Sequence, residues 1–140
     1  MEGVTNVLVI KSVPGLDVSL KGDFFRLWAE FTRPLHHLTS KEMEVLAGFL
    51  RKRHELSKII SDRDTLDRVL MSEDSKRDVR EMCNVTTKHL QVILSTFRKN
   101  GVLKDNKLHM KLIPNVKEDG VGLMIYFSFK DEKRVKLSGS

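Results

Sequence analysis

The chain has 140 residues, 40% of them hydrophobic and 31% charged, which is ordinary for one globular domain with a real core and disfavours disorder. No apolar run approaches the roughly 20 residues of a membrane-spanning helix, and no signal-like segment opens the chain, so we expect a cytoplasmic protein. The net charge of +6 favours a polyanionic partner.

The sequence before residue 38 predicts one strand and one helix. Thr5–Val13 is rich in β-branched residues and stops at the turn pair Pro14-Gly15, which predicts a short strand. Phe24–Phe31 predicts a short helix with its aromatic side inward, ended by Pro34. Together they predict an N-terminal extension over residues 1–37.

The next helix has a clear beginning. Thr39 and Glu42 have the spacing of a capping box, and the helix is expected to run to about Lys58. Its apolar residues recur with helical period: Met43, Leu46, Ala47 and Leu50, widened by Val45 and Phe49. A second, shorter helix is predicted over Asp62–Leu70.

The segment Lys76–Leu103 has the pattern of a helix-turn-helix, in which a short helix and a longer one are joined by a tight turn. Ser72 or Asp74 would cap its first helix, and Thr86 its second. The positions expected to face inward are all apolar: Val79, Cys83, Val85, Leu90 and Ile93. These side chains would hold the two helices together.

The outward positions of the second helix are candidates for contact with DNA: Thr86, Thr87, Lys88, Gln91, Val92 and Ser95. Gln91 can pair with adenine, and Lys88 can reach a guanine or a phosphate. Thr86 and Thr87, at the helix N-terminus, can hold a phosphate with help from backbone N–H groups. The alternative is that all of them are ordinary surface residues.

Beyond Gly101 the apolar period changes from helical to alternating, which predicts a two-stranded wing. Its first strand would carry Leu108, Met110 and Leu112 alternating with Lys107, His109 and Lys111, and its second would be Leu123–Phe129. Lys107 and Lys111 would share one face and Lys117 would lie at the tip, where they can follow the phosphate backbone. From Thr86 to Lys117 there are seven lysines and arginines against one acidic residue. The alternative is a solvated charged face, and Glu118 and Asp119 oppose a phosphate contact at the tip.

These residues carry a resemblance to a known family. Leu38–Phe129 resembles a winged helix-turn-helix domain, and the junction FRKNGVLKDNKL, Phe97–Leu108, is similar to that of many winged-helix regulators, where a Gly ends the recognition helix. LTSKEMEVL and LIPNV are also similar to small winged-helix proteins of crAss-like, Bacteroides-infecting phages. The resemblance implies a mainly α fold with a small β-hairpin (α+β), with the winged domain over 38–130. The residues that follow, 131–140, are rich in charge, which predicts a flexible tail.

Two residues depart from the family's pattern. Arg80 stands where a small residue usually lets the second helix approach, so its side chain must snorkel to the surface. Asn84 stands where the turn usually has Gly, and Asn tolerates the left-handed backbone conformation better than other side chains.

Two functions remain open at this point. The first is a non-enzymatic duplex DNA-binding protein, a transcriptional regulator or replication accessory of a bacterium or phage, that uses a recognition helix over 86–100 and the wing. The second is a structural or adaptor protein, such as a phage virion component, whose winged helix docks onto protein.

The aromatic group of the extension, Phe24, Phe25, Trp28 and Phe31, either covers the core or forms an oligomer contact. The edge strand Val7–Ile10 offers a second such contact. A homodimer formed through Phe24, Trp28 and the N-terminal strand would imply a palindromic DNA site.

Chemistry at a catalytic or metal centre is not predicted. Histidines 36, 37, 54, 89 and 109, with the single Cys83, lack the paired spacing of a zinc site. Asp62, Asp64 and Asp67 belong to a helix balanced by Arg63 and Arg68. We therefore expect no enzyme, no metal and no cofactor.

Overall fold

The fold is described by a computed structural model over residues 5–11, 24–116 and 122–128. Its contacts divide the chain into two compact units, one made of residues 1–17 with 115–140 and the other of Val18–Pro114. The described residues hold six α-helices and short antiparallel strands, which confirms the mainly helical α+β class. This division differs from the predicted ranges 1–37 and 38–130, since the aromatic helix falls in the larger unit.

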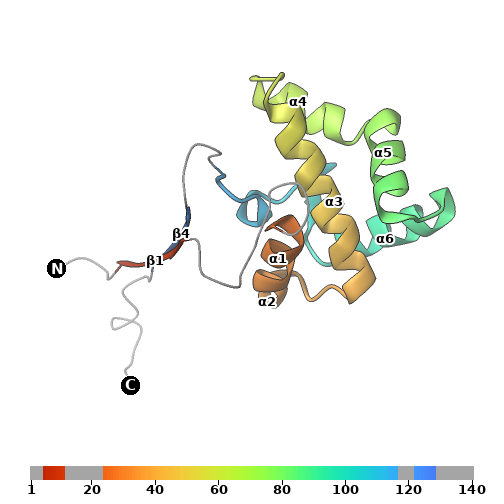
Figure 1. Cartoon of the computed structure of the whole chain (residues 1–140). Coiled ribbons are helices and arrows are strands. Elements are labelled where there is room, and N and C mark those ends of the chain that lie inside the picture. Colours follow the sequence, from red (N-terminus) through yellow and green to blue (C-terminus); the bar gives the residue numbers. More distant parts are fainter. Residues whose placement is uncertain (1–4, 12–23, 117–121, 129–140) are drawn as a thin grey trace. The chain divides into compact units, whose positions relative to one another are not determined.

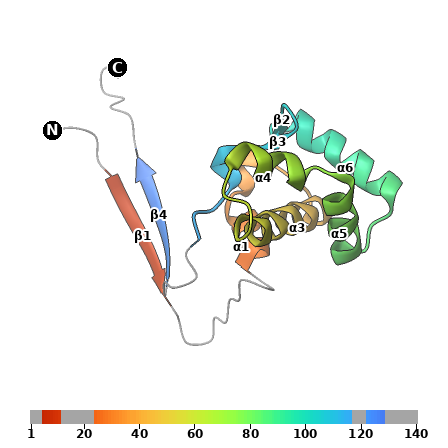
Figure 2. The ribbon, with the colours of Figure 1, turned by 90° about the horizontal axis from the view of Figure 1, so that it is seen from above.

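The larger unit is built around α3, Ser40–Ser57, which lies between α1, Phe24–Phe31, and α5, Glu73–Cys83 (Figures 1 and 2). The predicted capping box begins it: the Glu42 N–H donates to Thr39 Oγ1 at 3.4 Å, and the Thr39 N–H donates to Glu42 Oε1 at 2.9 Å. All six predicted apolar positions of this helix are buried. Because α3 is covered on several sides, it forms the centre of the core.

The N-terminal helices cover one side of α3. Phe25 and Ala29 of α1 are buried, and so is His36 at the end of α2, Arg33–His36. Pro34 does not end the first helix, which stops at Phe31; it lies in the first turn of α2. Proline suits this position because an N–H group in the first turn of a helix has no intrahelical acceptor, so its absence costs no hydrogen bond.

Three capped helices follow α3. Asp62 caps α4, Arg63–Leu70, Ser72 caps α5, and Thr86 caps α6, Thr87–Lys99, each accepting a hydrogen bond from a backbone N–H in the first turn. Of the two caps predicted for α5, Ser72 is the correct one. These caps satisfy backbone donors that the helices leave unpaired at their N-termini.

The predicted wing is wrong in its strands. The hairpin after α6 consists of β2, Leu103–Lys104, and β3, Lys107–Leu108, with Leu103 opposite Leu108. Its two-residue turn, Asp105-Asn106, has positive φ at both positions, 54° and 60°. That conformation matches the right-handed twist of paired strands and is tolerated by Asp and Asn. The residues expected to continue the first wing strand form a 3-10 helix instead, η1, Met110–Leu112.

The smaller unit contains the remaining two strands. β4, Gly122–Ser128, pairs antiparallel with β1, Thr5–Lys11, with Leu8 opposite Ile125. Both strands were predicted from sequence, but β4 was assigned to the wrong partner. Pairing with β1 over seven residues replaces the expected wing pairing, and Met110–Leu112, expected to pair with β4, forms η1.

Candidate nucleic-acid interface

The turn between α5 and α6 depends on Asn84. This residue adopts the left-handed conformation, with φ 56° and ψ 53°, and its N–H donates to the Arg80 carbonyl. The Val85 N–H donates to the same carbonyl at 3.0 Å. Lys41 of α3 closes this end of α5 by donating to the Cys83 carbonyl at 2.8 Å. The turn therefore has the tight geometry predicted from the sequence.

The inner side of α6 packs into the core through Leu90, Ile93, Leu94 and Phe97. Phe97 meets Phe49 of α3 edge to face, with ring centroids 6.4 Å apart. Four of the five positions predicted to face inward are buried, and the fifth, Val85, is half-buried. Packing thus orients α6 with its opposite side towards solvent.

The close approach of helices occurs at a residue that the sequence analysis missed, Gly48 of α3. A β-carbon on this glycine would lie 2.9 Å from Cys83 Sγ and 3.3 Å from Val79 Cγ1 of α5. Arg80, where a small residue was expected, is only half-buried and causes no such crowding. The signal was a glycine inside an otherwise strong helical pattern.

The six residues predicted to face outward on α6 and at its N-cap are all exposed: Thr86, Thr87, Lys88, Gln91, Val92 and Ser95. The Thr86 hydroxyl is already engaged, because it accepts a hydrogen bond from the His89 N–H at 3.0 Å. Any phosphate contact of Thr86 would have to use its hydroxyl proton or backbone. The side chains of the other five residues are exposed to solvent.

Most of the described lysines and arginines on and after α6 form no ion pair with any described residue. α6 contains no acidic residue. Of the described lysines and arginines on and after α6, Lys107 forms an ion pair and five form none: Lys88, Arg98, Lys99, Lys104 and Lys111. Four described arginines before α6 also form none: Arg33, Arg63, Arg68 and Arg80. In contrast, Lys76 and Arg77 of α5 pair with Glu73 and Asp74.

Lys107 and Lys111 do not share a strand face, contrary to the prediction. Lys107 lies on β3, with its Nζ 4.0 Å from Asp64 Oδ1 of α4, and Lys111 lies in η1. Lys117 lies outside the described residues. The register instead places Lys104 opposite Lys107 at the end of the hairpin. The Asp-Asn pair between these two lysines was the sequence signal for this turn.

The acidic residues of α4 serve separate structural roles. Asp62 accepts from the Thr65 N–H and hydroxyl, and these hydrogen bonds lower the pKa of its carboxyl. Asp67 is 8% exposed and pairs with Arg53 of α3 at 3.3 Å, a partner that the sequence analysis did not identify. Asp64 is exposed near Lys107. Asp62, Asp64 and Asp67 thus have different partners: Thr65, Lys107 and Arg53 in turn.

Cys83 is a core residue. Burial raises the pKa of its thiol to about 11, and the nearby Glu44 adds to the rise. Its Sγ lies 3.5 Å from the Glu44 carbonyl oxygen. A search of the described part of the chain finds no three His, Cys, Asp or Glu side chains able to hold a metal ion together.

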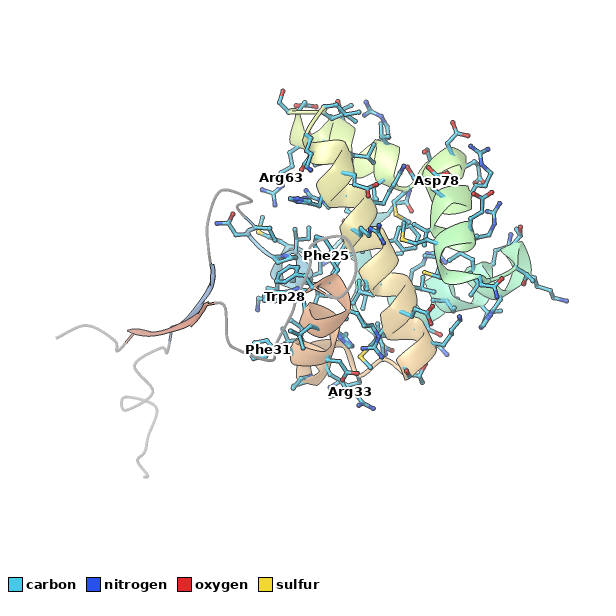
Figure 3. All side chains as sticks on the ribbon, viewed as in Figure 1. Phe25, Trp28, Phe31, Arg33, Arg63 and Asp78 are labelled. Atoms are coloured by element: carbon cyan, nitrogen blue, oxygen red, sulfur yellow. The ribbon has the colours of Figure 1, made fainter. Side chains whose placement is uncertain are left out.

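The aromatic group of α1 divides between core and surface. Phe24 and Phe25 are buried, which leaves Phe24 little surface for an oligomer contact. Trp28 Nε1 donates to the Leu112 carbonyl at 2.9 Å and so ties η1 to α1. Phe31 stacks on Trp28 and projects from the side of α1 away from α3 (Figure 3). Leu27, Phe31 and Leu35 are the exposed apolar residues of this region.

Comparison of this chain with known proteins identifies no similar protein. No protein-family model, no curated protein and no solved structure matches this chain. Within the described residues, no helix combines the length and apolar character needed to cross a membrane. The fold and the interface therefore define a mainly helical α+β protein that presents a basic helix.

Proposed function

We propose that this protein is a winged helix-turn-helix protein that binds duplex DNA through α6, as a regulator or replication accessory in a bacterial or phage-infected cytoplasm. The observation that carries the proposal is the exposed side of α6, which has no acidic residue and is followed by Lys104 and Lys111, two cations that form no ion pair among the described residues. Unpaired surface cations lose little when they meet phosphates, and counterion release then favours binding.

The residues of the interface divide into two roles. Gln91 and Lys88 project from the exposed side of α6 and have the donors that read adenine and guanine in the major groove. Lys104, Lys107 and Lys111 follow α6 along the chain and suit the phosphate backbone, as a short wing would. The proposed wing is the four-residue β2–β3 ladder in place of the longer one first expected.

The direct test is binding of a fluorescently labelled random duplex, followed by selection of preferred sequences. We expect replacement of Lys88 or Gln91 by Ala to weaken binding to a selected site by about 1–3 kcal/mol for each lost bidentate pair. Replacement of Lys104 should instead weaken binding to all sequences and reduce the salt slope by about 0.9 if one phosphate contact is lost.

The matched control is Arg33→Ala, which removes one exposed cation from α2 (Figure 3). This variant should bind like the unchanged protein, apart from a small effect of net charge. Equal affinities of the Lys88→Ala, Gln91→Ala and unchanged proteins across several salt concentrations would contradict the proposal.

A second candidate function is protein docking, as an adaptor or virion component. The observation that favours it is the exposed apolar set Leu27, Phe31 and Leu35, with exposed fractions of 44%, 45% and 58%. Exposed apolar side chains that gather on neighbouring helices can mark a protein contact. Weak retention on heparin together with a stable high-order oligomer in size-exclusion chromatography would support docking over DNA binding.

A further inference from the structure

The outermost ridge of α6 has an apolar residue at its centre. Lys88, Val92, Ser95 and Lys99 are spaced four, three and four residues apart, so they follow one line along an α-helix. This line is opposite the buried side formed by Leu90, Ile93, Leu94 and Phe97. All four ridge residues are exposed, and Val92 keeps 59% of its surface in solvent.

Packing does not explain Val92. Its side chain lies outside the core, and a β-branched residue is not a favoured helix former on an exposed surface. Val92 is also the one large apolar residue that α6 exposes. A cation lies one turn before it on the ridge, at Lys88, and another two turns after it, at Lys99.

This arrangement matches the chemistry of one base pair. Among the base edges of the major groove, the C5-methyl group of thymine is the apolar feature, and it is read by apolar side-chain contact. Flanking cations suit the phosphates on either side of the groove. A polar or charged residue at position 92 would gain nothing from the methyl group.

We propose that Val92 is a specificity-determining residue that contacts the thymine methyl group, so that preferred sites carry an A·T pair opposite the middle of α6. This inference rests on the proposed DNA binding and adds the identity of one base pair. Lys99 supplies affinity on one side of Val92, whereas Val92 adds discrimination to the base contacts proposed for Lys88 and Gln91.

The test uses the full chain and a duplex selected from a random pool. Each thymine of the selected site is replaced in turn by uracil, which removes the methyl group and keeps the pairing. At one position the unchanged protein should bind the uracil duplex about fourfold more weakly, the value of one buried methyl group. The Val92→Ala variant should bind the thymine duplex more weakly than the unchanged protein does, and the ratio between its affinities for the thymine and uracil duplexes should be smaller there.

The matched control is Ile59→Ala, which removes an apolar side chain that is 80% exposed and lies outside α6. It should keep the thymine preference. Equal affinity of the unchanged protein for every thymine and uracil duplex would overturn the role of Val92 and leave DNA binding intact. Failure to bind any duplex, even at low salt, would overturn both proposals.

Discussion

Gly48 controls how closely α5 can approach α3. Its missing side chain leaves room for Cys83 and Val79, whose side chains would otherwise be within 2.9 Å and 3.3 Å of a β-carbon. A buried cysteine has a short side chain packed on all sides, so it cannot move far. The distance between α5 and α3 therefore depends on the absence of a β-carbon at Gly48.

Gly48→Ala should lower the free energy of unfolding by about 1 kcal/mol, because overpacking costs about 1–3 kcal/mol and alanine regains about 1 kcal/mol of helix propensity. Urea unfolding followed by circular dichroism measures this change. In a Cys83→Ala background the same substitution should become neutral or stabilising, because the crowding atom is gone. A stabilising Gly48→Ala in the unchanged protein would show that the helices can separate freely.

His36 is fully buried and joins three segments. Its Nδ1 accepts the Leu38 N–H at 3.0 Å, so the ring proton is on Nε2, which donates to the Ala29 carbonyl at 2.8 Å. Its own carbonyl accepts from Asn100 Nδ2 at 2.8 Å, at the end of α6. Burial lowers the pKa of the ring below 6.5, the hydrogen bond to Ala29 opposes this, and the nearby His37 and Arg33 lower it further.

A lowered pKa means that the unfolded chain binds a proton at a higher pH than the folded protein does. The contribution of neutral His36 to stability is therefore complete above pH 6.5 and is lost as the pH falls below that value. Unfolding by urea at a series of pH values should show this loss. His36→Gln should be less stable at neutral pH, and its stability difference from the unchanged protein should shrink on acidification. A constant difference would contradict this role of His36.

At the scale of elements, the short turn before α6 depends on a backbone conformation. Asn84 has φ 56°, which costs most L-residues about 1–2 kcal/mol and costs glycine almost nothing. Two N–H groups, those of Asn84 and Val85, reach the Arg80 carbonyl only in this conformation. The turn thus sets the direction in which α6 leaves α5.

Asn84→Gly should therefore keep or raise the stability of the protein, whereas Asn84→Ala should lower it by about 1 kcal/mol. Thermal unfolding of the two variants, compared at one pH and concentration, measures the difference. Equal stabilities of the Gly and Ala variants would mean that the turn has another source of rigidity.

At the scale of the whole molecule, α1 and α2 belong to the same compact unit as the helix-turn-helix. Phe25, Ala29 and His36 are buried against the core, and Trp28 holds η1 through the Leu112 carbonyl. The larger unit, 18–114, contains all of these contacts. An extension that merely covered a complete winged domain would bury less of itself.

A fragment of residues 18–114 should fold cooperatively with the helical content expected of α1 to α6. A fragment of residues 38–114 should lose stability by several kcal/mol, because removing Phe25 alone resembles a large-to-small core substitution, worth about 3–5 kcal/mol. Circular dichroism and urea unfolding compare the two. Equal stability of the fragments would show that 38–114 is a complete domain.

Local patterns predicted the helices well because their signals lie within a few residues. Thr39 with Glu42, and Thr86, cap where their spacing indicates, and the helical period of α3 marks its buried residues. The exposed residues of α6 followed from the same period. The long first wing strand predicted from the alternation after Gly101 is wrong. Three apolar residues at every second position also suit a tight hairpin followed by a 3-10 turn.

The amino-acid sequence by itself determined the helices, their caps, the left-handed turn at Asn84 and the polar side of α6, because each depends on neighbours in the chain. Only the tertiary structure decided which segments meet across long separations: β1 with β4, Trp28 with Leu112, and Gly48 with Cys83. Each strand or surface can pair with more than one other segment. The spacing of residues within a segment does not indicate which distant segment it will contact.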